Sequence, residues 1–568
     1  MRRACLLALV FFTAAMLTAC GSGSSSPASS PPRTVTVNWV NTYWSPSGQV
    51  QVPEPASAAL NIEALVPQAD GSITLLQGSA TSTPGVFTIA NVPAGDYWLA
   101  AGGGGAFWTS TSTFDAGTDI AAGQTPLTST SNTTNFDISV GGIASESTEE
   151  WVEFLTDPPF GFVQFGILPD STSLTGGFGF GGDTDWSQIN TGFLMQYELE
   201  TLGSLNSYVL GPELTLSNLA FTNGATNTIS GTLNPATETS LNLSVTGSGW
   251  ASVFNNVGPA AANVQDSVLT LTAEPYVTGV NAGPYSIILP ALSLVAPTPG
   301  GLGFFQQGQT EYFDPEAAFC ADFTGEPSAY VVPINPPILT DQNFGALQYS
   351  DPFDPAWTRA LALCQQATIP IPIQNSSDTY SFVLVDGESA APSNSPLAPL
   401  ALPVQNPTIN GSSILTANTA DATTPALSWT APTGAAPYGY RVREFVLTTS
   451  NDAPSFQQVG IYSTSATSVT LPPLAGGNTY IFTITTEVDG VANMQTSPYR
   501  SALPTGFASV VSAPITISPA AAPQIDGDIE EWRSLVRPKP DSPANAKTQA
   551  PAVPCTVSGH PVVRAFCE

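Results

Sequence analysis

The 568-residue chain is short of basic side chains. It has one histidine and 12 Lys and Arg against 43 Asp and Glu, which gives a formal net charge of −31. Between Arg33 and Arg359 there is no Lys, Arg or His at all. An acidic surface repels nucleic-acid phosphates, so we predict that no nucleic acid is bound. The lone imidazole, His560, argues against His-based catalytic triads and His-ligated zinc.

Charge of either sign is scarce, and so is helical periodicity. Charged residues make up 10% of the chain, against about 25% in typical globular proteins. Thr, Ser, Val and aromatic residues form short runs broken by Gly, Pro or Asn, a pattern typical of β-strands. We predict an all-β, multidomain protein in which β-sandwich modules flank a larger β-rich central domain.

The amino terminus has the features of an export signal. Two arginines are followed by an apolar stretch over residues 6–17, which ends in Leu17-Thr18-Ala19-Cys20 and then Gly21. This string resembles the lipobox of bacterial lipoproteins; an ordinary secretory signal with a chance cysteine is the alternative. The resemblance implies a signal peptide over 1–19 and acylation of Cys20, palmitate included. It places the protein in the cell envelope outside the cytoplasm, at the outer membrane if the cell is Gram-negative.

Residues 20–33 read as a flexible tether. They are mostly Gly, Ser and Pro and cannot form a core. No later segment is long and apolar enough to span a bilayer. The membrane is therefore predicted to be a partner only through the lipid.

Cysteine is rare in the rest of the chain. With Cys5 removed and Cys20 acylated, four cysteines remain, and an even number in an oxidising compartment favours disulfides. Pairing of sequence neighbours joins Cys320 to Cys364 and Cys555 to Cys567; pairing across the two groups stays open.

Two segments resemble known modules. Within residues 34–140, apolar alternation from Val86 to Ile89 precedes the turn Pro93-Ala94-Gly95-Asp96 and Tyr97. The string resembles the transthyretin-like, carboxypeptidase-regulatory-like β-sandwich, which implies a structural or adhesive add-on without catalysis.

Residues 403–516 resemble a fibronectin type III domain. Leu427-Ser428-Trp429 is followed at the expected distance by Leu474 and, six residues later, by Tyr480. The resemblance implies that Trp429 lies in the core and that Leu474 and Tyr480 form a tyrosine corner.

The remaining segments match less well. Residues 141–402 form a central β-rich domain of unknown family, either a propeller or a pair of sandwiches. Residues 517–568 are predicted to be a largely disordered tail, although Ile525 to Trp532 resembles the start of a DOMON-like module.

Some polar and aromatic residues are candidate ligand contacts. Asp183 and Asp185 flank Thr184 after a glycine run, and are either Ca²⁺ ligands or part of a solvated turn. No other cofactor is predicted. Three tryptophans in polar surroundings are candidates for glycan stacking, with packing at a core or rim as the alternative: Trp44, Trp108 and Trp186.

These observations predict a surface-anchored, non-enzymatic lipoprotein that presents β-sandwich modules for adhesion, envelope architecture or glycan contact. An extracellular glycan or an envelope protein is the expected partner. The alternative is a carbohydrate-processing enzyme that uses paired carboxylates in the central domain, drawn from these acids: Glu149, Glu150, Glu153, Asp183, Asp185, Glu311, Asp314 and Glu316.

Overall fold

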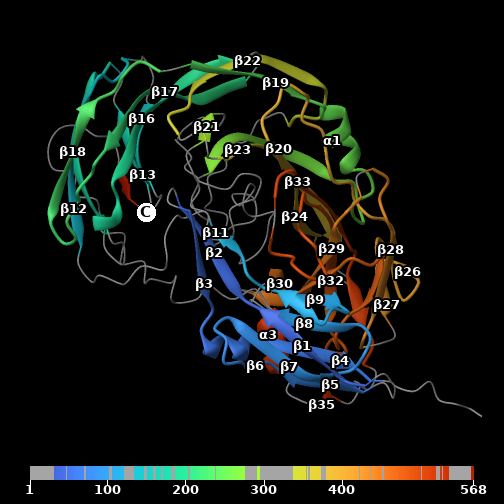
Figure 1. The fold of residues 1–568 in the computed structure, drawn as a ribbon. Helices are drawn as coiled ribbons and strands as arrows, with labels where there is room; N and C mark the ends of the chain where they lie inside the picture. The colour runs from blue at the N-terminus through green and yellow to red at the C-terminus, as the bar shows by residue number, and fades with distance from the viewer. Residues whose placement is uncertain are drawn as a thin grey trace, which may run out of the picture.

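The structure is a computed structural model, and almost every described element is a β-strand, as the composition predicts (Figure 1). No helix in the part of the chain that it describes is long and apolar enough to cross a membrane. The described residues are 31–45, 48–68, 72–101, 105–120, 133–145, 150–157, 162–167, 170–180, 186–202, 205–236, 238–274, 291–293, 337–353, 355, 358–372, 379–420, 423–434, 436–450, 453–500, 502–519, 525–526, 529–536 and 565–567.

The first unit is a sandwich of two sheets, with strand orders β10-β1-β7-β6 and β5-β4-β8-β9, beside a small sheet β11-β2-β3. Phe87 and Ile89 of β7 and Tyr97 and Leu99 of β8 fill its core. Its elements are β1 (Arg33–Asn38), β2 (Val40–Ser45), β3 (Gly48–Pro53), η1 (Ala56–Asn61), β4 (Ile62–Pro67), β5 (Ile73–Gln77), β6 (Ser79–Ala80), β7 (Val86–Val92), β8 (Tyr97–Ala101), β9 (Ala106–Thr109), β10 (Thr113–Asp115) and β11 (Asp119–Ile120).

The strand–turn–strand string predicted around Gly95 is present, but the two strands belong to opposite sheets. β7 pairs with β1 and β6, whereas β8 pairs with β4 and β9. The turn is therefore a corner between layers, with Gly95 at φ 121°. Glycine adopts such a φ without the steric cost that a side chain brings.

The central region contains two pairs of packed β-layers, and each pair encloses its own core. Sheet β15-β12-β18 faces β13, β16 and β17, and ribbon β19–β22 covers the sheet that contains β20, β23 and β24. The elements are β12 (Thr134–Gly141), β13 (Glu150–Asp157), β14 (Phe162–Ile167), β15 (Ser173–Phe180), η2 (Trp186–Gln188), β16 (Thr191–Leu202), β17 (Leu205–Ser217), β18 (Thr226–Thr232), β19 (Glu238–Val245), α1 (Gly247–Val253), β20 (Asn263–Glu274), β21 (Ala291–Ser293), β22 (Gln342–Ser350), β23 (Thr358–Pro372) and β24 (Thr379–Ala390).

One predicted boundary is wrong. The sequence analysis extends the first module to residue 140, but β12 pairs with β15 and β18 along its whole length. β12 therefore belongs to the central region, because strand pairing rather than chain order decides which core a strand joins.

The third unit has the fibronectin-type arrangement. Sheet β26-β25-β28-β31 packs on the sheet that contains β30, β29, β32 and β33. Its strands are β25 (Gln405–Ile409), β26 (Ser412–Ser413), β27 (Asn418–Ala420), β28 (Ala426–Thr430), β29 (Gly439–Ser450), β30 (Ala453–Thr464), β31 (Ser468–Thr470), β32 (Thr479–Val488), β33 (Thr505–Val511) and β34 (Ile515–Ile517).

The expected core residues take their predicted places. Trp429 is buried and packs edge-on against Tyr440 at 5.1 Å between ring centroids. The Tyr480 hydroxyl accepts a hydrogen bond from the Ala475 N–H at 3.1 Å, beside buried Leu474. This is the tyrosine corner that the spacing predicts.

Part of the segment predicted to be a tail is ordered, at the string that resembles the start of a DOMON-like module. After β35 (Ile525–Asp526), helix α3 (Ile529–Val536) places Trp532, at 0% exposure, in the core of the fibronectin-type unit. The last described strand, β36 (Ala565–Cys567), pairs with β14. An apolar helix face buried against a core cannot be recognised from a short segment alone.

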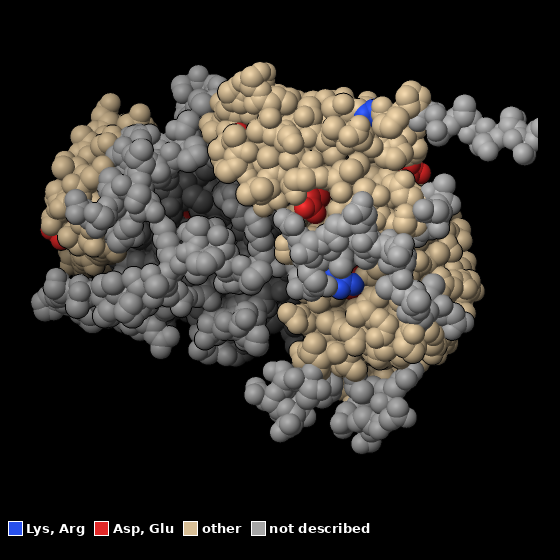
Figure 2. All heavy atoms as spheres, turned by 90° about the horizontal axis from the view of Figure 1, so that it is seen from below, with Lys and Arg blue, Asp and Glu red and all other residues tan. Residues whose placement is uncertain are grey.

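The units are joined by one continuous strand network. A single set of 20 hydrogen-bonded strands runs from β5, β4, β8 and β9 through β30 into the fibronectin-type sheet, and on through β33, β24, β23 and β20 to β17. Figure 1 shows the blue first unit lying beside the orange and red strands, although the sequence separates them widely. On the face drawn in Figure 2, charged side chains of the described residues appear as isolated spots.

Candidate functional site

Several predicted site residues lie outside the described residues. These are Cys20, Cys320, Cys555, Asp183 and Asp185, and of Trp44 only the backbone, in β2, is described. The predicted acylation, calcium site and stacking role of these residues therefore stay predictions. Among the residues that the structure does describe, no group of three or more His, Cys, Asp or Glu is arranged to hold a metal ion.

For Trp186 the structure supports core packing, the alternative to glycan stacking. Its side chain is 2% exposed and packs edge-on against Phe136 at 4.7 Å and near Phe221 at 6.3 Å between ring centroids. The turn η2 directs the indole into the core between the two sheets, although the flanking sequence is polar. Trp186 is a core residue and not a stacking platform.

Trp108 lies at a junction between units. It is half-buried in β9 and packs against Trp98 with 5.1 Å between ring centroids. Trp98 in turn contacts Tyr462 of β30 at 5.3 Å and donates from Nε1 to the carbonyl of Thr470 at 3.2 Å. This tryptophan pair joins the first sandwich to the fibronectin-type unit, which leaves Trp108 less surface for a sugar ring than an isolated indole has.

Two cysteines lie on described strands. Cys364 of β23 is buried and disulfide-bonded, but its expected partner, Cys320, lies outside the described residues. Cys567 lies in β36, and its expected partner, Cys555, is likewise outside them. Both pairings stay predictions.

Among the candidate catalytic acids, Glu153 is the one whose side chain is described. Its side chain is buried in β13 and forms a hydrogen bond with Tyr197. Burial, followed by the Glu153 carboxylate, raises the pKa of the Tyr197 hydroxyl well above its ordinary value. A carboxylate inside a packed core is not placed to meet a sugar, so this residue gives the enzymatic alternative no support.

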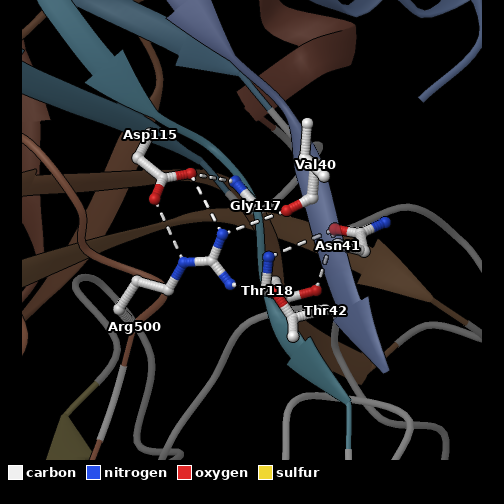
Figure 3. A network of polar contacts seen from close by, with 7 residues as sticks. All are labelled: Val40, Asn41, Thr42, Asp115, Gly117, Thr118 and Arg500. Atoms are coloured by element: carbon white, nitrogen blue, oxygen red, sulfur yellow. Dashed lines mark hydrogen bonds and ion pairs between the residues drawn. The ribbon is translucent and has the colours of Figure 1, made fainter. Parts of the chain in front are cut away.

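The most developed polar site is one that the sequence analysis did not single out. Asp115 ends β10, and Arg500 lies in the loop over residues 489–504 between β32 and β33, named here the FG loop. Arg500 Nε donates to Asp115 Oδ2 at 3.1 Å and Nη2 to Oδ1 at 3.3 Å, so the guanidinium engages both carboxylate oxygens (Figure 3). We call this ion pair and the backbone around it the clasp.

The clasp also reaches the backbone of the first unit. Arg500 Nη2 donates to the Val40 carbonyl at 3.0 Å and Nη1 to Thr42 Oγ1 at 3.4 Å. The Gly117 N–H donates to Asp115 Oδ1 at 2.9 Å. A guanidinium presents five donors in a fixed planar fork, and here it joins β2 and β10 to the FG loop.

Glycine is required at position 117. A Cβ placed there would lie 2.1 Å from the Val40 carbonyl oxygen and 2.5 Å from Arg500 Nη2. Next to it, Asn41 Oδ1 accepts from both the N–H and the hydroxyl of Thr118, each at 3.1 Å (Figure 3). The chain from 115 to 118 is thus held against β2.

The rest of the FG loop is docked as well. The Asp115 N–H donates to the Thr496 carbonyl at 2.7 Å, and Thr109 Oγ1 donates to the Gln495 carbonyl at 2.9 Å. The Tyr499 hydroxyl donates to the Ala101 carbonyl at 2.8 Å, and buried Met494 joins the core of the first sandwich. The loop contacts the first unit from Met494 to Arg500.

A buried ion pair lies at the base of this loop. Arg441 of β29 and Glu487 of β32 approach to 2.8 Å with little exposure, and the Tyr438 hydroxyl donates to Glu487 Oε2 at 2.8 Å. Burial, followed by the Glu487 charge, raises the pKa of Tyr438 well above its ordinary value. Tyr438 therefore stays a neutral donor at physiological pH, and the pair is held by hydrogen bonds as buried charges require.

Only a weak signal in the sequence could have indicated the clasp. Arginine is so rare that each one invites a search for a partner, but the acids outnumber the cations. Asp115 and Arg500 are 385 positions apart, and pairing over such a distance has no local pattern.

Comparisons with known proteins leave the chain without a family. No protein-family model matches it, and no curated protein matches it. Among solved structures, the fibronectin domains FN1–FN3 of chicken CNTN1 cover 66% of this chain and 99% of their own, at 8% identity and a TM-score of 0.12. A leucine-rich repeat protein from Bacteroides thetaiotaomicron matches over 36% of this chain and 26% of its own, at 11% identity and a TM-score of 0.08. At these scores neither likeness carries an argument about function.

Proposed function

We propose that this protein is a non-enzymatic scaffold of the cell envelope, tethered outside the cytoplasm through acyl chains on Cys20. The scaffold holds a transthyretin-like and a fibronectin-type module in one fixed relative orientation, for adhesion, envelope architecture or glycan contact. The observation that supports it best is the docked FG loop, since a loop whose polar groups are used internally serves orientation rather than ligand capture.

Three independent contacts support a fixed orientation. The clasp closes one side of the junction, the tryptophan pair Trp98 and Trp108 fills another, and β9 pairs in parallel with β30 between them. Helix α3 adds a fourth surface, because it contacts both β8 and β30. Domains joined by a small polar interface move relative to each other, whereas here strand pairing, apolar packing and ion pairing act together.

The anchor is tested by changing Cys20 to Ser in the full chain expressed in a bacterium that processes lipoproteins. We expect the wild-type chain in the membrane fraction, labelled by a palmitate analogue, and the variant unlabelled. A wild-type chain that keeps residues 1–19 and stays in the cytosol would overturn the proposed address.

The contact role is tested on a glycan array with the purified full chain, with and without Ca²⁺. Binding that needs Ca²⁺ and is lost on changing both Asp183 and Asp185 to Asn would assign a glycan partner. If no glycan binds, the scaffold role would have to rest on protein contacts within the envelope.

A further inference from the structure

Among the strands that the structure describes, β18 is an open edge of the β15-β12-β18 sheet. It pairs with β12 in parallel from Asn135↔Thr226 to Gly141↔Thr232, without a break in register. In Figure 1 these strands lie at the outer margin of the molecule. The opposite edge strand, β15, contains three glycines and contacts β36, so β18 is the more regular of the two edges.

The hydrogen bonds at the ends of β18 show which backbone groups are available. The Asn135 N–H donates to the Ala225 carbonyl and the Leu233 N–H donates to the Gly141 carbonyl. Backbone groups alternate in direction along a strand, so the odd-numbered residues turn toward β12. The even-numbered ones turn their N–H and C=O away from it: Thr226, Thr228, Ser230 and Thr232.

These four residues are open to an incoming strand. All four are exposed, and within the described part of the chain no hydrogen bond to their backbone groups is found. Proteins protect such edges with lysines, prolines, bulges or covering segments. β18 has no charged residue, no proline and no bulge.

The charge distribution favours a second copy of the same chain as the source of the strand that pairs with β18. The protein carries a net charge of −31, yet residues 214–237 contain no charged residue. Two acidic molecules can therefore approach each other here with little repulsion. The nearest described carboxylate on the sheet, Asp137, is one strand away from the edge. Two Asp137 side chains in a paired sheet would be separated by three strand spacings, about 14 Å, which exceeds the physiological Debye length of about 8 Å.

The strand is also complementary to itself. In an antiparallel pair with its own copy, a two-fold axis at Ile229 places Thr226 opposite Thr232 and Thr228 opposite Ser230. All four outward-facing residues then meet outward-facing partners, and every pair exchanges both of its backbone hydrogen bonds. The side chains that meet across the axis are hydroxyls, which are favourable cross-strand neighbours.

We propose that β18 is a self-association edge, through which two copies of this chain pair antiparallel about a two-fold axis at Ile229. Such a contact is isologous and closes at two copies. The inference does not depend on acylation, so it is tested in the full chain carrying Cys20→Ser, which removes any contribution from lipid.

Sedimentation velocity over a concentration series tests the proposal. We expect the Cys20→Ser chain to dimerise reversibly. Adding Thr228→Pro removes an outward N–H that β12 does not use, and should raise the dissociation constant about tenfold or more. Thr228→Val keeps the N–H and the β-branched shape, and should dimerise like the parent. A chain that is monomeric at every soluble concentration would overturn the proposal, as would a folded Thr228→Pro variant with unchanged dimerisation.

Two further experiments keep the test decisive if Thr228→Pro disturbs the fold. Ser230→Glu leaves the strand ladder intact but places two like charges close to the axis, and should also weaken the dimer. Thr228→Cys mixed with Ser230→Cys should form an intermolecular disulfide, because hydrogen-bonded pairs have Cα atoms about 5.5 Å apart. Equal cross-linking within each variant alone would contradict the register. Failure of these tests leaves the anchored scaffold untouched, because that proposal concerns a different surface.

Discussion

Arginine is rare in this chain, and most of the described arginines bind a carboxylate or a backbone carbonyl of another segment. Arg500 binds Asp115 across two units, Arg441 binds Glu487 inside one, and Arg359 binds Asp351 at 2.8 Å. Arg33 donates to the Gly95 carbonyl, and Arg533 of α3 donates to the carbonyl of Pro473. Arg500 and Arg359 each engage both oxygens of a carboxylate and also a backbone carbonyl, of Val40 and Phe353 respectively.

Gly117→Ala should open the clasp. The added methyl group meets the Val40 carbonyl oxygen and the Arg500 guanidinium, and overpacking of this kind costs about 1–3 kcal/mol. Thermal unfolding should show the loss. The matched control is Gly141→Ala, where the new Cβ meets nothing closer than Thr232 Oγ1 at 3.7 Å. Equal effects at the two positions would contradict the assigned role of Gly117.

Glu388 predicts a pH dependence. Burial raises its pKa to about 8, although backbone N–H groups of Leu400 and Ala398 donate to it and act in the opposite direction. The folded chain therefore holds a proton that the unfolded chain releases above its ordinary pKa of 4.5. This contribution to stability is complete below pH 4.5 and is lost as the pH rises towards 8, by up to about 1.4 kcal/mol per pH unit.

Glu388→Gln should accordingly flatten the dependence of unfolding free energy on pH between 4.5 and 8, and should stabilise the chain at the upper end of that window. Denaturant unfolding at several pH values measures it. Asp96→Asn, on the surface, serves as control for the change in net charge. A variant whose stability falls with pH as steeply as the wild type would show that another group controls the slope.

At the scale of elements, the local sequence pattern is sufficient to predict a strand that has one apolar face and one solvent face. The alternation in β7 and the fibronectin-type spacing from Trp429 to Tyr480 predict the observed strands, because burial of every second residue produces an alternating apolar pattern in the sequence. β8 is different, since all five of its residues are buried. Tyr97 and Leu99 face the core of the first sandwich, while Trp98 faces the neighbouring unit.

The features that the local sequence did not indicate share one physical origin. Trp186 and helix α3 lie in polar surroundings along the sequence, and their burial depends on surfaces that distant segments supply. The clasp is invisible for the same reason, as its two ends meet only in three dimensions. Composition predicts the fold class, but it carries no information about which distant segments contact each other between units.

Trp532→Ala tests the packing of helix α3. The indole is fully buried in a core that the fibronectin-type unit shares with residues of the first unit, and large-to-small changes at such aromatic positions cost about 3–5 kcal/mol. We expect a corresponding fall in the midpoint of thermal unfolding. The matched large-to-small change Leu60→Ala, at a side chain 67% exposed, should change stability by less than about 0.5 kcal/mol. A silent Trp532→Ala would contradict the burial of this helix against the core.

At the scale of the whole molecule, the distribution of basic residues makes trypsin a reporter of the junction. No cleavage site lies between Arg33 and Arg359, so the denatured chain should yield one fragment spanning residues 34–359. In the folded chain, Arg500 is the described arginine that lies outside helices and strands. The clasp holds it, and cleavage requires local opening.

Asp115→Ala should therefore speed native cleavage after Arg500, because it removes the ion pair and the acceptor for the Gly117 N–H while leaving the strands of both units intact. The fragment 34–359 from the denatured variant should be unchanged, which separates local opening from global unfolding. If cleavage after Arg500 is equally slow in both chains, the backbone contacts at Gln495 and Thr496 are sufficient to hold the FG loop. The Arg500 guanidinium would then orient the loop without keeping it closed. Faster cleavage in the variant would show that the carboxylate holds this loop. Equal rates would contradict that role of Asp115 and leave the junction to strand pairing, tryptophan packing and helix α3.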